Sequence, residues 1–475
     1  MVRAKKMARS RKIAGLALAA GLAAAGLTAS TAGTAVATPA AVCGGTGAMT
    51  TTTGSLPDGA KYLIQCPSVA WNGTLYLYSH GYVRPGASNP AQDVGDPATG
   101  AYMLGQGFAL AGSSYATTGW AIAQALPDQI STLDVFDSTY GQPKTTVAWG
   151  HSLGGIITAG LIQDFPSRFN AALPMCGVLS GGVATWNTAL DAAFAFQKLI
   201  DPSVQIVNIT NPLANLQAAE AAVTAAQQTR KGRARLALVS ALADTPGWFD
   251  PASREPAAND YAAQEANQFL WATQVTFPFV FAFRAELEAR AGGNPSWNTG
   301  VNYFTDLAKS ADFNEVAALY QRAGLGLNVD VTRLDASPRI AADPNAEAYL
   351  IKNIVFNGDI SVPVLSMHTT GDGLVVPENE QAYLSAVDRA GHGNLLRQVF
   401  VHRAGHCTFT PAETITAVQT LENRLSTGQW NVPSPSAMNT EALALGSAFN
   451  VAPPAFVSFR PAQYLRPFDL APSFP

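Results

Sequence analysis

The chain has 475 residues, of which 48% are hydrophobic and only 13% are charged. This composition excludes a disordered chain, because so apolar a chain buries enough surface to fold. Without residues 1–37, which hold six basic residues and no acid, the formal net charge falls from −4 to −10. We therefore expect no nucleic-acid partner, since a basic surface is the footprint of such binding.

Residues 1–37 have the pattern of a secretory signal peptide. The six cations lie within positions 1–12, an apolar run of fifteen residues follows at 13–27, and Ala-Val-Ala at 35–37 has the small residues of a cleavage site. The apolar run is shorter than the roughly 20 residues that a spanning helix needs. We expect a secreted, extracellular protein with no membrane span.

Two blocks of the chain alternate β-rich runs with helical stretches, which is the pattern of a parallel α/β sheet. The first block is 38–180, with strands expected at 74–81, 108–116, 145–150 and 171–179. The second block is 356–430, with strands expected at 362–369 and 395–402. The sequence therefore predicts one α/β core divided between two parts of the chain.

The segment 181–355 between the two blocks is rich in alanine, helical in its spacing and interrupted by Pro and Gly. We expect a large helical insertion that caps the sheet. Residues 431–475 are rich in proline and are expected to pack as an extended C-terminal tail.

The stretch TTVAWGHSLGG, residues 145–155, places Ser152 between a predicted strand and a predicted helix. Gly150 and Gly154 stand two positions away on either side. A sharp strand-to-helix turn is crowded, so such neighbours need to be almost free of side chain. At the start of the helix, backbone N–H groups and the helix dipole favour negative charge. The pattern predicts that Ser152 is a nucleophile.

A serine hydroxyl is a weak nucleophile and needs a base, which an acid in turn orients. Asp372 follows the expected strand 362–369 in the stretch TTGDGLVVP, and His406 follows the strand 395–402 in HRAGHC. The chain thus supplies the three residue types in the order Ser, Asp, His.

With GHSLGG, GDGLVVP and AGH in these places, residues 73–430 resemble the α/β-hydrolase superfamily, and the elbow resembles those of secreted serine esterases and lipases. The resemblance implies an α/β-hydrolase fold, a mostly parallel central sheet flanked by helices, here with the cap insertion. It also implies Ser152 as nucleophile, Asp372 as acid and His406 as general base. We expect no cofactor.

The oxyanion hole is expected to have two backbone donors. One is the N–H of Leu153, directly after the nucleophile. The other is the N–H of Tyr82, because SHGYV after the strand at 74–79 is similar to the family's His-Gly-x oxyanion turn.

Four cysteines, an even number in an exported chain, favour two disulfides. Three pairings are possible, and free buried thiols are the alternative. We favour Cys43–Cys66, which closes a short loop and leaves Cys176–Cys407. The pair HC at 406–407 is also similar to the tannase and feruloyl-esterase family, in which a cysteine beside the serine bridges to one beside the histidine. This sequence departs from that pattern, because His151 precedes the serine.

His402 and His406 are four positions apart, a spacing seen in zinc sites. They straddle a predicted strand end, not a helix, and no glutamate lies between them. We therefore expect no metal.

The leading hypothesis is a monomeric serine esterase that cleaves small-molecule or polymeric carboxylic esters through an acyl-enzyme. The alternative is an exported serine exopeptidase of the prolyl-oligopeptidase or tripeptidyl-aminopeptidase type. That enzyme needs buried acids to hold a free amine, and the cap offers Glu265, Glu286 and Glu288 as candidates. A binding protein on the same fold is a third class, but it would normally have lost a member of the triad.

The cap is also rich in aromatic side chains, namely Trp186, Trp248, Phe269, Trp271, Phe277 and Phe279. They indicate either an apolar or aromatic group in the substrate or the core of the cap itself. Lipid, aromatic ester and polyester all remain possible substrates.

Overall fold

The computed structural model describes residues 41–468. The expected signal peptide, 1–37, lies outside the described residues. Within residues 41–468, no helix has both the length and the apolar character needed to cross a membrane.

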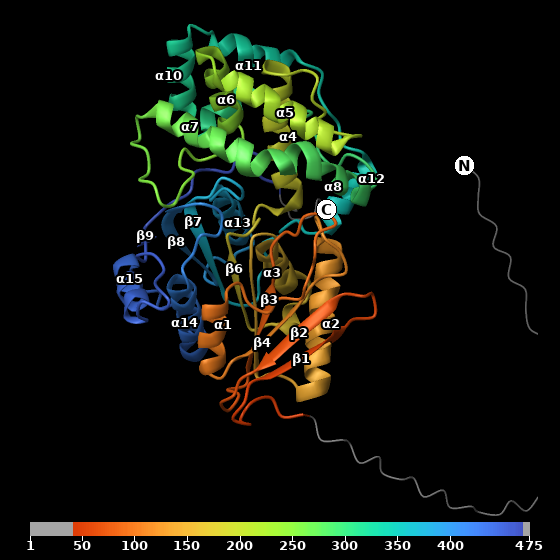
Figure 1. Ribbon diagram of the computed structural model, residues 1–475, viewed down its shortest axis with the longest axis vertical. Helices are drawn as coiled ribbons and strands as arrows, with labels where there is room; N and C mark the ends of the chain where they lie inside the picture. The colour runs from red at the N-terminus through yellow and green to blue at the C-terminus, as the bar shows by residue number, and fades with distance from the viewer. Residues whose placement is uncertain (1–40, 469–475) are drawn as a thin grey trace, which may run out of the picture. The chain divides into compact units, whose positions relative to one another are not determined.

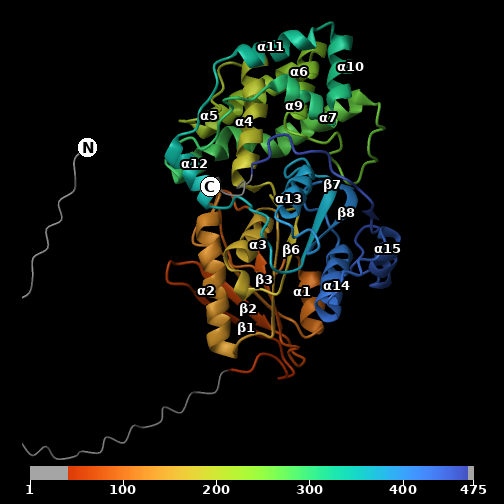
Figure 2. The same ribbon diagram turned by 180° about the vertical axis from the view of Figure 1, so that it is seen from behind.

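The described residues form one nine-stranded sheet with the order β1-β2-β4-β3-β5-β6-β7-β8-β9 (Figures 1 and 2). The strands are β1 (Thr50–Ser55), β2 (Lys61–Cys66), β3 (Thr74–Ser79), β4 (Ala109–Ser113), β5 (Thr145–His151), β6 (Ala171–Met175), β7 (Val364–Gly371), β8 (Leu396–Ala404) and β9 (Phe456–Val457). The pairs from β4 to β8 are parallel, and the pairs that attach β1, β2 and β9 are antiparallel. This is the α/β-hydrolase fold that the sequence predicted.

Helices cover both faces of the sheet. On one face lie α2 (Ile122–Tyr140), α3 (Leu153–Asp164) and α13 (Glu378–Arg389); on the other lie α1 (Pro97–Gly105), α14 (Pro411–Thr427) and α15 (Pro435–Ala444). A short 3₁₀ turn, Pro166–Arg168, joins α3 to β6. Because β3 and α3 are covered on all sides, they are almost continuous apolar runs, TLYLYS and LGGIITAGLIQD.

The chain between β6 and β7 forms the helical cap, which lies over the end of the sheet where β5 meets α3 (Figure 1). Its helices are α4 (Gly181–Leu199), α5 (Pro212–Gln227), α6 (Arg230–Ala241), α7 (Tyr261–Trp271), α8 (Arg284–Ala291), α9 (Tyr303–Lys309), α10 (Phe313–Ala323), α11 (Leu327–Ala336) and α12 (Pro344–Lys352), with two π-helical turns, Ala272–Thr276 and Phe279–Phe283, between α7 and α8. The cap has an apolar core of its own, which includes Phe194, Phe196 and Tyr320.

Two parts of the fold differ from expectation. The hairpin β1–β2 was not predicted, because β1 is a run of threonines, TTTTGS, whose residues alternate between exposed and half-buried positions without any apolar period. The C-terminal tail is not wholly extended, since it contains the helix α15 before the short strand β9. The prolines that indicated an extended tail include Pro435, which occupies the first turn of α15 behind the N-cap Ser434.

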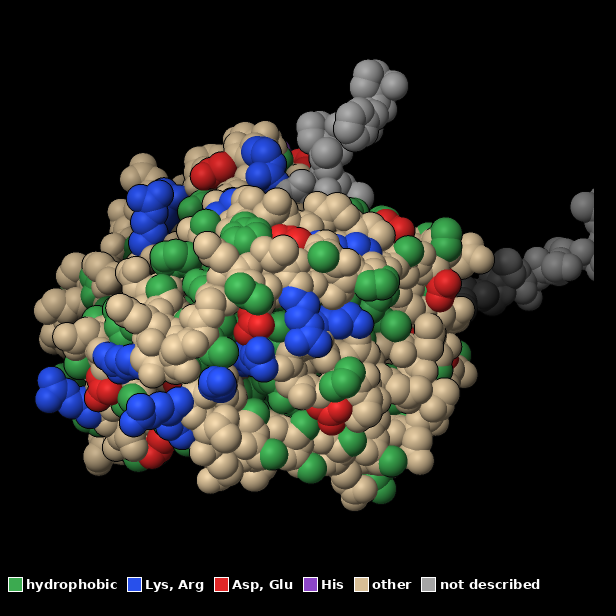
Figure 3. All heavy atoms as spheres, turned by 90° about the horizontal axis from the view of Figure 1, so that it is seen from above, with side chains coloured by type: hydrophobic (Ala, Val, Ile, Leu, Met, Phe, Trp, Pro, Cys, Tyr) green, Lys and Arg blue, Asp and Glu red, His purple; other side chains and the backbone are tan. Residues whose placement is uncertain are grey.

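Seen from above in Figure 3, the cap side of the molecule carries basic and acidic side chains close to one another. Apolar side chains are scattered among them in small groups. This face therefore presents mixed charge and not a field of one sign.

Candidate active site

Ser152 occupies the sharp turn between β5 and α3. Its φ of 59° lies in the left-handed region that non-glycine residues rarely adopt. A Cβ on Gly150 would lie 2.4 Å from Ser79 O, and one on Gly154 only 1.8 Å from the same atom. Both positions therefore require glycine, which is the reason that the motif surrounds the serine with glycines.

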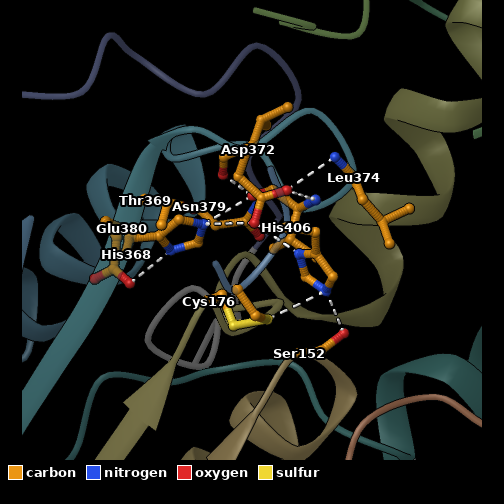
Figure 4. Close-up of polar contacts among 12 residues, drawn as sticks. Ser152, Cys176, His368, Thr369, Asp372, Leu374, Asn379, Glu380 and His406 are labelled. Atoms are coloured by element: carbon orange, nitrogen blue, oxygen red, sulfur yellow. Dashed lines mark hydrogen bonds and ion pairs between the residues drawn. A yellow bond between two sulfur atoms is a disulfide. The ribbon is translucent and has the colours of Figure 1, made fainter. Parts of the chain in front are cut away.

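The structure brings Ser152, His406 and Asp372 into one chain of hydrogen bonds (Figure 4). His406 Nε2 lies 2.7 Å from Ser152 Oγ, and His406 Nδ1 lies 2.6 Å from Asp372 Oδ2. A carboxylate can only accept, so Nδ1–H donates to Asp372 and Nε2 is left to accept from the serine hydroxyl. The arrangement lets the imidazole withdraw a proton from Ser152.

Asp372 is fixed by more than the histidine. It is fully buried at the end of β7, and its Oδ1 accepts hydrogen bonds from the N–H groups of Leu374 and Val375, both at 3.0 Å. The two oxygens thus have separate partners, which holds the carboxylate in the orientation that His406 requires.

His368 and Glu380 form a buried pair behind Asp372 that sequence reasoning missed (Figure 4). His368 Nδ1 lies 3.1 Å from Glu380 Oε1, and His368 Nε2 lies 2.7 Å from Val375 O and 3.7 Å from Asp372 Oδ2. Burial lowers the pKa of His368, but the hydrogen bond and charge of Glu380, with the charge of Asp372, outweigh it and raise the pKa above its usual value. A positive ring at this place stabilises the Asp372 carboxylate. The only sign in the sequence was slight: His368 lies on β7, four residues before Asp372.

The expected oxyanion donors stand beside the serine. Tyr82 and Leu153 line the same cavity as Ser152, and a Cβ on Gly81 would lie 3.4 Å from Ser152 Cβ, so the turn after β3 approaches Ser152 closely. As the first residue of α3, Leu153 has an N–H with no acceptor within the helix. His80 is buried next to this turn, and burial lowers its pKa.

Both expected disulfides are present in the structure, Cys43–Cys66 and Cys176–Cys407. Cys176 follows β6 and has a φ of 42°; Cys407 follows His406 and has a φ of 54°. The Cys176–Cys407 bridge therefore ties the loop of His406 to the end of β6, the strand beside β5 and Ser152. Within residues 41–468, the cluster that could hold a metal is Cys176, Cys407 and His406, but its two sulfurs are joined to each other and are not free thiolates.

His402 does not share a site with His406. Its side chain is 44% exposed, and its ring nitrogens lie 3.2 Å from Thr370 Oγ1 and 3.5 Å from a carboxylate oxygen of Glu255. Their four-residue spacing therefore does not bring the two imidazoles together.

A cavity of about 170 Å³ opens at Ser152, between the sheet and the cap. Its walls are mainly aliphatic and aromatic, and no charged side chain lines it within the described part of the chain. The aromatic residues in its wall are Tyr82, Trp120, Trp186, Phe196, Phe277, Phe279, Phe281 and Tyr464. Of the six cap aromatics singled out in the sequence, Trp186, Phe277 and Phe279 line the cavity.

The three cap acids considered for an exopeptidase do not line this cavity. Glu286 pairs with Arg290, and Glu288 pairs with Arg284. Glu265 is 1% exposed and accepts a hydrogen bond from a glutamine of α5. Each carboxyl group thus has a partner in the cap itself.

No protein-family model matches the chain. An o-phthalyl amidase of Xanthobacter agilis is similar to it, with 29% identity over 430 residues that cover 84% of this chain and 92% of the amidase.

Solved structures similar to the chain include the rice cell wall degrading esterase LipA from Xanthomonas oryzae, with 12% identity, coverage of 79% of this chain and 87% of that chain, and a TM-score of 0.33. Feruloyl esterase B from Aspergillus oryzae is 14% identical, with coverage of 80% of both chains and a TM-score of 0.38. The assignment of the fold here depends on the strand order described above.

Proposed function

We propose that the protein is a secreted serine hydrolase that cleaves carboxylic esters through Ser152, His406 and Asp372. The observation that carries the proposal is the continuous hydrogen-bond chain from Asp372 through His406 to Ser152, which opens on an uncharged apolar cavity. The two disulfides support secretion, because such bonds persist in oxidising compartments.

The reaction begins with attack of Ser152 Oγ on the ester carbonyl carbon, while His406 Nε2 takes the hydroxyl proton. The N–H groups of Leu153 and Tyr82 donate hydrogen bonds to the oxyanion of the tetrahedral intermediate, and each donor lowers the activation free energy by about 3 kcal/mol. His406 then gives its proton to the departing alcohol, which leaves an acyl-Ser152. Water, deprotonated by His406, releases the acid.

The cavity supports a small uncharged substrate with an apolar or aromatic group. Burying an unpaired charge among the phenylalanines and tryptophans of its wall would cost several kcal/mol. A free amine would find no carboxylate there, since Glu265, Glu286 and Glu288 have partners elsewhere. This argues for the esterase over the exopeptidase.

A second candidate is an amidase that acts on an aromatic carboxylic amide. The specific observation in its favour is the 29% identity to an o-phthalyl amidase over most of both chains. The chemistry is the same, except that His406 must protonate a departing amine.

The test combines labelling with a rate panel. A serine-directed fluorophosphonate should label the parent protein at Ser152 and leave Ser152→Ala unlabelled. p-Nitrophenyl acetate, butyrate and benzoate should be cleaved far faster than leucine p-nitroanilide, with benzanilides deciding between ester and amide. Label on another serine, or fastest cleavage of the aminoacyl anilide, would overturn the proposal.

A further inference from the structure

The C-terminal segment 462–468, far from the triad in the sequence, reaches the cavity. Tyr464 is 2% exposed and is part of the cavity wall. Its side chain packs with Ala184 of α4 and with Val376. The segment therefore contributes a buried aromatic ring to the space that opens at Ser152.

The core holds one side of this segment. The N–H of Tyr464 donates to Gln381 Oε1 at 3.0 Å, and the ring of Tyr464 packs against Val376, just before α13. Gln381 belongs to α13, which follows the Asp372 turn. This end of the segment is thus fixed to the same part of the core that carries the triad acid.

The cap holds the other side. Arg466 pairs with Asp191 of α4 and donates from Nη2 to Trp297 O at 3.2 Å, and the ring of Phe468 lies 5.6 Å from the ring of Trp297. Anchors on both sides leave little freedom to the residue between them.

We propose that residues 462–468 form a strap between core and cap, and that Tyr464 sets the largest substrate group that the cavity admits. This inference rests on the proposed function. The ring forms part of the wall of a cavity of about 170 Å³, so removing it would enlarge the space that opens at Ser152. Because the Tyr464 backbone is held by Gln381 and the neighbouring Arg466 by Asp191, the ring resists displacement, so a bulky acyl group is excluded.

The test measures kcat/KM for a ladder of p-nitrophenyl esters from acetate to octanoate. Tyr464→Ala should raise the octanoate-to-acetate ratio by about tenfold or more, the scale on which a hydrophobic pocket discriminates size. Tyr464→Phe keeps the ring and should leave the ratio within about twofold. Tyr383→Ala is the matched control, because Tyr383 is equally buried, at 1% exposed, on α13 but does not line the cavity.

A second readout needs no turnover. Alkyl fluorophosphonates of increasing chain length should label Tyr464→Ala at nearly equal rates. The parent should be labelled more slowly as the chain lengthens. If Tyr464→Ala does not fold, Arg466→Ala, which removes the anchors to Asp191 and to Trp297 O but keeps the ring, should shift both readouts in the same direction. An unchanged size profile in a folded variant overturns the strap, whereas a parent protein that no phosphonate labels overturns the proposed function instead.

Discussion

The ring of Tyr82, at the proposed oxyanion turn, lies 5.0 Å from the ring of Phe279 in the second π-helical turn of the cap. Phe283 closes the group, 6.0 Å from Tyr82 and 5.4 Å from Phe279. The cap therefore covers the cavity and also contacts the side chain of the residue whose N–H is proposed to stabilise the oxyanion.

Phe283→Ala should lower kcat by about tenfold while KM stays nearly constant, because Phe283 supports Tyr82 without lining the cavity. If the Tyr82 N–H is held less firmly, its hydrogen bond to the oxyanion weakens, which destabilises the transition state more than it destabilises the bound ester. The measurement compares steady-state kcat and KM of the variant and the parent. The affinity of a trifluoromethyl ketone, whose adduct with Ser152 carries an oxyanion, reports separately on the oxyanion hole. Phe269→Ala, another half-buried cap phenylalanine outside the cavity, is the control. Equal effects of the two variants would refute this role of Phe283.

Asp372→Asn should lower kcat by on the order of 10⁴ without unfolding the protein, since the wrong histidine tautomer would face Ser152. His402→Ala should leave kcat unchanged, because its side chain lies at the surface. Circular dichroism establishes folding, and pre-steady-state acylation measures the step concerned. Full activity of Asp372→Asn would remove Asp372 from the triad; Glu380 is a poor replacement, as it is committed to His368.

His368 should make the fold more stable in mild acid. Its pKa is raised in the folded state, so its charged form stabilises the protein fully below the unfolded pKa, about 6.5. That contribution is lost as the pH rises through the folded value. The difference in Tm between the parent and His368→Gln should therefore be larger near about pH 6 than near about pH 9. A constant difference across this window would contradict the charged state assigned to His368.

The carboxyl groups inside the cap should add to this trend. Burial, with the charge of Asp312, raises the pKa of Glu315 to about 9, and burial raises that of Glu265 to about 7. The folded state then binds protons that the unfolded chain has released, so stability falls as the pH rises from about 4.5 towards 9. Glu315→Gln, which stays neutral, should flatten the alkaline side of a Tm-against-pH curve. An unchanged curve would mean that Glu315 is ionised in the folded protein.

The two disulfides should differ in their effect on the reaction. The double variant Cys176→Ser/Cys407→Ser should lower kcat more than Cys43→Ser/Cys66→Ser. The reason is that only the Cys176–Cys407 bridge holds the loop of His406. Each pair of substitutions removes one disulfide and so one loop constraint on the unfolded chain, which should lower the free energy of unfolding by about 2–4 kcal/mol. Comparing kcat with Tm for the two double variants separates the effects. Equal loss of kcat at equal Tm would mean that the His406 loop does not need its bridge.

The parts of the site that the sequence predicted are those carried by short motifs. Ser152, Asp372 and His406 each lie in a turn directly after a strand. Close backbone contacts restrict which residues can stand beside them, so these turns can be recognised from neighbouring residues in the sequence. His368 and Tyr464 carry no such mark. Their roles come from contacts with Glu380 and with α4 that only the folded chain creates, and both resemble ordinary core residues in the sequence.

The sheet is assembled from two segments that are far apart in the chain, since β6 ends at Met175 and its neighbour β7 begins at Val364. Closing so long a loop has an entropic cost that grows with the logarithm of its length. A cap that folds early around its own apolar core shortens the effective loop and brings both strands together. Amino-acid changes in that core, such as at Phe194 or Tyr320, should then slow the joining of β6 to β7 and so lower the rate at which the whole protein folds.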